Sequence, residues 1–106
     1  MKKILLGALA SLSFTSMTFA SSYFCESDKV EVIVEPISGS QLYQLGVLNK
    51  DSQETIFLKE ASAYLGTGAD ATFNVPGEAI LIIDAAGFGD LTFTDKTYAN
   101  LECELN

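Results

Sequence analysis

The 106-residue sequence contains no histidine and no tryptophan, and its only basic residues are six lysines. Without histidine the chain lacks the commonest general base, the Ser/His/Asp and Cys/His catalytic arrangements, and every histidine-based zinc site. A pair of carboxylates is the remaining catalytic option, but nearly all of the fourteen acidic residues occupy turns or alternating strand positions, where exposure to solvent explains them. We therefore expect a protein that is not an enzyme and that needs no cofactor.

Two glycine-containing segments resemble ligand-binding loops only superficially. Asp84, Asp90 and Asp95 flank a loop that offers oxygen atoms to a calcium ion, but their spacing matches no EF-hand. Aspartates that cap an ordinary turn are the favoured interpretation, so no metal site is expected. The segment 66–68 lacks the lysine and the strand-to-helix context of a phosphate loop.

The N-terminal segment has the order of a secretory signal peptide. Lys2 and Lys3 precede an apolar stretch over 4–14, and small residues at Thr18 and Ala20 fit a cleavage site after Ala20. The apolar stretch is about half as long as a membrane-spanning helix, so an uncleaved anchor is the minor alternative. We expect residues 1–20 to be removed and 21–106 to form one small domain, periplasmic or secreted.

Removal of this leader would leave four lysines against fourteen acidic residues, a net charge of about −10. Such a charge disfavours nucleic acid and anionic membranes as partners and favours a cationic protein. The alternative is that the acidity only keeps an exported protein soluble. We expect a monomer that does not contact the membrane after cleavage.

The two cysteines, Cys25 and Cys103, lie near opposite ends of the predicted domain. In an oxidising compartment we expect them to form one disulfide, which would stabilise the fold by roughly 4 kcal/mol in the chain-entropy model. Two free thiols or an intermolecular bridge are the alternatives.

Alternating apolar residues and turn residues predict an all-β chain without a convincing helix. The expected strands cover 30–35, 41–48, 54–58, 70–75, 78–84, 91–94 and 98–105. The run Ala79–Ile83 lacks polar alternation, so we expect it to be a central strand covered on both faces, with 80–83 as the most buried segment. Residues 59–64 are expected to form a loop. About seven short strands predict a small antiparallel barrel or sandwich, stapled by the disulfide.

The four tyrosines, Tyr23, Tyr43, Tyr64 and Tyr98, are candidate interface residues, although each is more often a strand residue half covered by its neighbours. Tyr64 stands out because it is expected in a glycine-rich loop and not on a strand.

Three stretches resemble the bacterial inhibitors of C-type lysozyme, a family with periplasmic and membrane-anchored branches that folds as a small antiparallel barrel. Residues 23–26, followed by 30–32, are similar to its opening Tyr-x-Cys-Asp/Glu and first strand. Residues 100–105 resemble its closing cysteine-bearing strand. In the middle, 57–64 and 73–79 look like its Ser-Gly-Tyr loop and its Phe-Trp-x-Lys-Gly turn.

This resemblance implies that Ser62, Tyr64 and Gly66 on one loop, and Pro76 and Gly77 on a turn, contact the partner. Pro76 stands where the family has its lysine, so the cation that would approach a lysozyme's catalytic carboxylates is missing from this turn. The expected function is therefore that of an exported, non-catalytic protein that binds and inhibits a cationic C-type lysozyme through 62–68 and 76–77. A small-ligand-binding barrel and an interaction module without a defined ligand are the alternatives.

Overall fold

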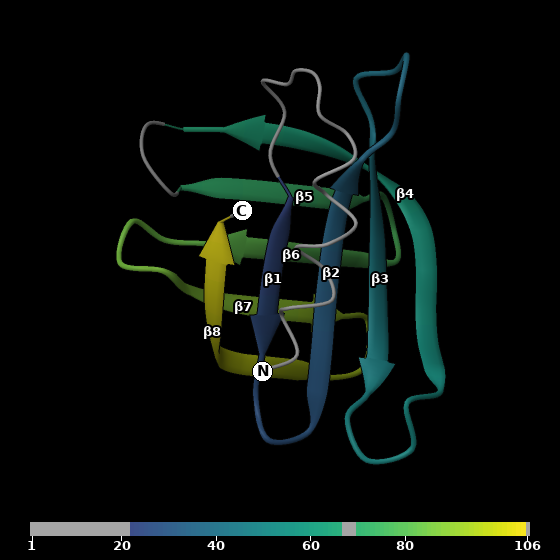
Figure 1. Ribbon diagram of the computed structural model, residues 1–106, viewed down its shortest axis with the longest axis vertical. Coiled ribbons are helices and arrows are strands. Elements are labelled where there is room, and N and C mark those ends of the chain that lie inside the picture. Colours follow the sequence, from purple (N-terminus) through teal and green to yellow (C-terminus); the bar gives the residue numbers. More distant parts are fainter. Residues whose placement is uncertain (1–21, 67–69, 106) are drawn as a thin grey trace.

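Eight strands follow one another in the computed structural model, which describes residues 22–66 and 70–105. They are β1 (Tyr23–Glu26), β2 (Val30–Pro36), β3 (Tyr43–Asn49), β4 (Thr55–Leu65), β5 (Ala71–Val75), β6 (Ala79–Ile83), β7 (Phe88–Phe93) and β8 (Thr97–Leu105). Each strand pairs antiparallel with the next, and β8 pairs with β1, so the meander closes into a barrel (Figure 1). Within the described ranges there is no helix long and apolar enough to cross a bilayer. The predicted signal peptide, 1–20, lies outside the described residues.

The predicted all-β class and the single disulfide are confirmed, with eight strands in place of about seven. The strand that the sequence did not predict is β1. It has only four residues, too few for an alternating pattern to develop, and its first three residues are all buried. Its partners β2 and β8 therefore define it as a strand.

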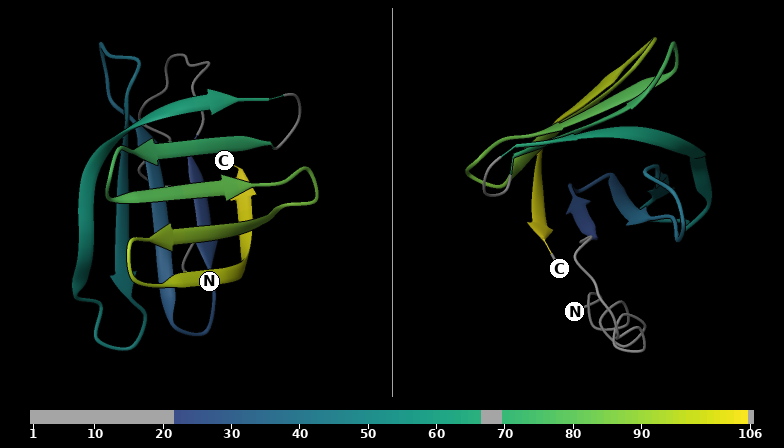
Figure 2. Two further views of the ribbon diagram at one scale, coloured as in Figure 1. Left: turned by 180° about the vertical axis from the view of Figure 1, so that it is seen from behind. Right: turned by 90° about the horizontal axis from the view of Figure 1, so that it is seen from above.

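The prediction of a loop over 59–64 is wrong, because these residues belong to β4. The first part of β4, up to Ala61, pairs with β3, and the part from Ser62 onward pairs with β5. Figure 2 shows β4 curving from one side of the barrel to the other. A strand that changes partners changes direction as well, so no single alternating pattern runs through its sequence.

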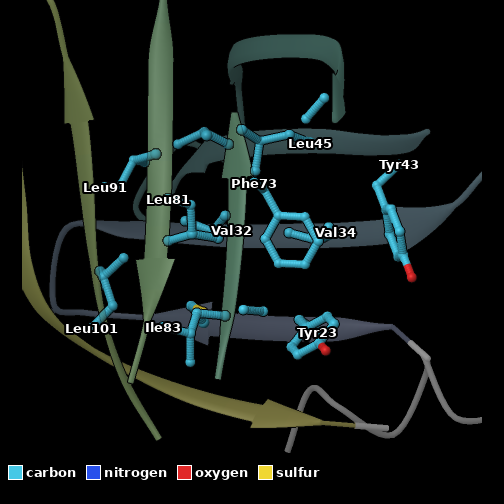
Figure 3. Close-up of a cluster of buried hydrophobic side chains, with 14 of the residues drawn as sticks. Tyr23, Val32, Val34, Tyr43, Leu45, Phe73, Leu81, Ile83, Leu91 and Leu101 are labelled. Carbon is cyan, nitrogen blue, oxygen red and sulfur yellow. The ribbon is translucent and has the colours of Figure 1, made fainter. Parts of the chain in front are cut away.

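Side chains that point inward fill the barrel. The fully buried ones are Cys25, Val30, Val32, Val34, Leu45, Val47, Phe73, Leu81, Leu91 and Leu101. Phe73 lies between Tyr23 and Tyr43, whose rings pack edge-on against it at centroid distances of 5.1 and 5.2 Å (Figure 3). Val30, Val32 and Val34, alternate positions of the strand expected over 30–35, all point inward. A barrel of eight strands is just wide enough for side chains to fill, as they do here.

The prediction that Ala79–Ile83 is covered on both faces is wrong. Ala79, Leu81 and Ile83 point inward and are buried, but Ile82 points outward and is 49% exposed. In a closed barrel every strand has one inner and one outer face, and none of the other described strands packs on the outside of β6. An apolar run alone does not distinguish a doubly covered strand from one whose outer face carries isoleucine.

The disulfide joins the first strand to the last. Cys25 lies directly opposite Cys103 in the pairing of β1 with β8, 78 residues apart in the sequence. The bond therefore fastens the seam where the barrel closes.

The connections between strands alternate between the two ends of the barrel, because every neighbouring pair is antiparallel. The connections 27–29, 50–54, 76–78 and 94–96 belong to one end by this alternation, which we call the turn end; in Figure 1 the first two are at the bottom of the view and the other two at its right. The other end holds the remaining connections, the start of β1 and the end of β8.

Candidate partner-binding surfaces

Ser62 and Tyr64 lie two residues apart on β4 and both point outward. Ser62 is opposite Asn74 and donates a hydrogen bond of 3.4 Å to its carbonyl oxygen, while Tyr64 is opposite Thr72. The expectation of a glycine-rich loop around Tyr64 is wrong, since Tyr64 stands on a strand. It is nevertheless 76% exposed, so its ring is free to contact a partner.

Gly66 follows the last residue of β4, at the end opposite the turn end. Its N–H donates to the carbonyl oxygen of Asp70 at 3.0 Å, and a Cβ built on it would stand 2.9 Å from the Cβ of Asp70. The close approach of these two backbone segments therefore requires glycine for structural reasons. Gly68, the last residue of the predicted loop, lies outside the described residues.

Pro76 and Gly77 form the predicted β-turn between β5 and β6. The N–H of Glu78 donates to the carbonyl oxygen of Val75 at 2.9 Å, and Gly77 has a φ of 75°, which glycine adopts without strain. The whole of β5, about 13 Å at 3.3 Å per residue, separates this turn from Gly66. The structure thus places Ser62 and Tyr64 on one face, and Gly66 and the turn at opposite ends of β5.

The structure brings a lysine to the Pro76–Gly77 turn from another strand. Lys59 on β4 places its Nζ 3.6 Å from Oε1 of Glu78, the residue that follows the turn. Sequence reasoning missed this contact because 59 was expected in a loop. The long first half of β4, seen only in the structure, places Lys59 here.

Of the four candidate tyrosines, only Tyr64 is exposed. Tyr23 and Tyr43 are buried against Phe73, and Tyr98 is half-buried. Burial raises the pKa of the Tyr23 hydroxyl above its usual 10.0, and the neighbouring Tyr43 raises this pKa further. Tyr23 and Tyr43 therefore belong to the core and not to a contact surface.

Two of the three aspartates considered for calcium, Asp84 and Asp90, accept hydrogen bonds from backbone N–H groups. The Asp84 carboxylate accepts hydrogen bonds from the N–H groups of Ala86 and Phe88, at 2.9 and 3.0 Å. The Asp90 carboxylate accepts a hydrogen bond of 3.0 Å from the N–H of Asn100, a residue with a φ of 58°. Among residues 22–66 and 70–105, no three His, Cys, Asp or Glu side chains gather where they could hold a metal ion.

Two surface hollows adjoin at the turn end, with volumes of about 320 and 420 Å³. Ile56 and Tyr98 line both of them. In the smaller hollow the ring of Phe93 packs edge-on against the rings of Phe57 and Tyr98, at centroid distances of 5.3 and 6.2 Å respectively. Lys96 lies 5.9 Å from the centre of the Tyr98 ring. The aromatic residues come from three strands and Lys96 from the connection between β7 and β8, so no local motif in the sequence could have grouped them.

The outer surface of the barrel has one part rich in glutamate and another part without charge. Six glutamates occupy outward positions on β8, β1, β2 and the first half of β4, and we call their surface the acidic face. They are Glu26, Glu31, Glu35, Glu60, Glu102 and Glu104. The outward residues of β5 and β6, together with two of β4, carry no charge, and we call their surface the uncharged face. They are Ser62, Tyr64, Thr72, Asn74, Ile80 and Ile82. The partition follows from strand register and could not be read from the sequence.

The packed interior leaves the outer faces and the barrel ends as places where a partner can bind. Searches of protein-family models, of curated proteins and of solved structures find no match to this chain.

Proposed function

We propose that this chain is an exported, non-catalytic protein that binds a cationic protein, and that a C-type lysozyme is the first partner to test. The observation that supports this most is the concentration of six outward glutamates on the acidic face. A surface of one sign attracts a partner of the opposite sign, raises the association rate and makes that rate salt-dependent.

The arrangement of three of these glutamates argues against solubility as their only role. Glu26 stands directly opposite Glu31 on one side and Glu102 on the other. Like charges in directly opposed positions destabilise a sheet, and within 22–66 and 70–105 only Glu26 of these three forms an ion pair, with the Nζ of Lys50 at 3.3 Å. Solubility requires net charge but no such row, whereas recognition of a cationic surface does benefit from one.

The proposal of lysozyme as the partner depends on the resemblance of residues 23–26 and 100–105 to the inhibitor family. A closed antiparallel barrel is compatible with that family and with many other functions. The small-ligand alternative has less support, because Phe73, Leu45 and other buried side chains occupy the interior in which a ligand would bind.

The experiment is lysis of a cell-wall suspension by a basic C-type lysozyme, with residues 21–106 added in excess. We expect lysis to slow at low salt and to recover as salt rises, since charges are screened over about 10 Å at 0.1 M. Undiminished lysis at low salt, with no complex on a sizing column, would overturn the proposal for this partner.

A matched pair of variants separates the acidic face from net charge. Replacing Glu26, Glu31 and Glu102 by glutamine should weaken binding at low salt at least tenfold. The control replaces three aspartates of the turn-end connections by asparagine, namely Asp28, Asp51 and Asp95. It removes the same amount of negative charge from another part of the surface and should weaken binding less. Equal effects would mean that net charge alone governs the interaction.

A further inference from the structure

We propose that the cationic partner docks on the outer face of β2, β3 and β4, along an apolar strip formed by Ile33, Gly46 and Leu58. The occupant is a segment of a cationic protein that presents an apolar side chain with lysine or arginine on either side of it. This inference rests on the proposed function and deepens it, since it names the contact surface and the chemistry of the segment that fits it.

Strand register places the three residues of the strip side by side. Ile33 on β2 is opposite Gly46 on β3, which in turn is opposite Leu58 on β4. Leu58 is 54% exposed, and its Cδ1 would stand 3.4 Å from a Cβ built on Gly46. The side chain of Leu58 therefore extends over Gly46, which has no side chain of its own, and presents an exposed apolar surface on which an apolar side chain of a partner can pack.

Carboxylates border the strip on both sides. Along β2, Glu31 and Glu35 each lie two residues from Ile33, about 7 Å away. On the side of Glu35, Gln44 and Glu60 continue a row across β3 and β4. Among the described residues, neither Glu35 nor Glu60 is joined to a lysine by an ion pair. Both negative charges are therefore available to a partner.

This combination selects one kind of occupant. Carboxylates on both sides of the strip repel the phosphates of nucleic acids and anionic lipids. The exposed leucine favours a partner that buries apolar surface, which a purely hydrophilic polycation does not do. A protein segment with an apolar residue between two cations satisfies both conditions.

The uncharged face provides the contrast. It also exposes apolar side chains, Tyr64 and Ile82, the latter 49% exposed and thus close to Leu58 in accessibility. Thr72 is opposite both of them, and the one carboxylate directly opposite either residue is Asp90 on β7, which faces Ile82 and accepts a hydrogen bond of 3.0 Å from the Asn100 N–H. That face therefore has a carboxylate on one side only, whereas the strip has carboxylates on both sides.

The test measures the dissociation constant of a basic C-type lysozyme for residues 21–106 by calorimetry at low salt. Leu58→Ser should raise the dissociation constant at least tenfold, and its matched control Ile82→Ser should leave it within twofold. The double variant Glu35→Gln, Glu60→Gln should raise the constant and flatten its dependence on salt. Circular dichroism melts of each variant establish that the fold is retained.

An independent readout uses the backbone amides of the wild-type protein. On addition of the lysozyme, the ¹⁵N–¹H resonance of Gly46 should shift or broaden, while that of Thr72 should stay in place. This measurement needs no substitution and so does not depend on whether a variant folds.

The outcomes separate this inference from the proposed function. If the wild-type protein binds the lysozyme but Leu58→Ser and the double glutamine variant bind equally well, the docking surface is wrong and the proposed function stands. Loss of binding in Tyr64→Ser with none in Leu58→Ser would likewise overturn it in favour of the uncharged face. If the wild-type protein does not bind the lysozyme at low salt, both are overturned for this partner.

Discussion

Gly89 on β7 lies directly against the sulfur of Cys103. A Cβ built on Gly89 would stand 3.0 Å from Sγ of Cys103 and 3.4 Å from the carbonyl oxygen of Ile82. Gly89 is buried and opposite Leu101, in the part of the wall next to the β1–β8 seam. The barrel thus accommodates its disulfide by omitting one side chain from the neighbouring strand.

We expect Gly89→Ala to lower the free energy of unfolding by about 1–3 kcal/mol, the usual cost of overpacking. The sulfur is held by the bond to Cys25 and cannot rotate away from the new methyl group. Urea unfolding of the oxidised protein measures the change. Gly46→Ala is the control, because its Cβ would meet the flexible end of Leu58 at 3.4 Å and the carbonyl oxygen of Ile33 at 3.8 Å, both ordinary contacts, and should change stability little. Equal midpoints for Gly89→Ala and the wild type would contradict the prediction.

A second pair of variants tests the inward and outward positions of β6. Ile82→Asp should leave the protein folded, because the outward side chain is half exposed and the new carboxylate stays in water. Leu81→Asp should unfold it, because the charge would be buried without a partner among fully buried side chains. Thermal melts followed by circular dichroism distinguish the two. A folded Leu81→Asp, or an unfolded Ile82→Asp, would show that the direction of these side chains is wrong.

Glu102→Gln should raise the free energy of unfolding by about 0.2–1 kcal/mol at low ionic strength, since like charges directly opposite each other destabilise a sheet. The gain should shrink in about 1 M salt, where the Debye length falls to about 3 Å. Chemical unfolding in urea at both salt concentrations measures it, with Asp51→Asn at the turn end as the control for net charge. A lower midpoint for Glu102→Gln would mean that its carboxylate stabilises the fold.

The raised pKa of Tyr23 predicts a loss of stability at alkaline pH. In the folded protein Tyr23 keeps its proton above the usual pKa of 10.0, whereas in the unfolded chain it loses the proton near that value. The stability that the protonated Tyr23 hydroxyl contributes is therefore fully present below pH 10. This contribution is lost as the pH rises from there through the raised pKa of the folded state. Tyr23→Phe should lose less stability than the wild type over this range in urea unfolding experiments. Parallel curves for the two proteins would contradict the assignment.

Local patterns in the sequence predicted the parts of the fold that depend on neighbouring residues. Alternation predicted strands at the positions of β2 and β3, and Pro76–Gly77 predicted a tight turn. The bend in β4 and the short β1 were not predicted, because pairing with distant strands determines both.

The candidate surfaces were less predictable than the fold. Glu26, Glu31 and Glu102 form one row only because closure of the barrel pairs β8 with β1. Register also placed Gly46 between Ile33 and Leu58, from three strands whose sequences share no motif. Sequence reasoning gave the sign of the charge but not its position, since position depends on how the strands are aligned with one another.

Closure by β1 and β8 also makes the order of the strands cyclic. Tyr23 and Leu105 are directly opposite each other in the same antiparallel pairing that joins every other neighbouring pair, so a linker of a few residues could connect them. A circular permutant opened in the 50–54 connection would then keep every strand pair. Its cysteines would be only a few residues apart in the chain, and the disulfide would contribute about 2 kcal/mol less in the chain-entropy model than it does across 78 residues. The permutant should therefore tolerate reduction better than the natural chain order does.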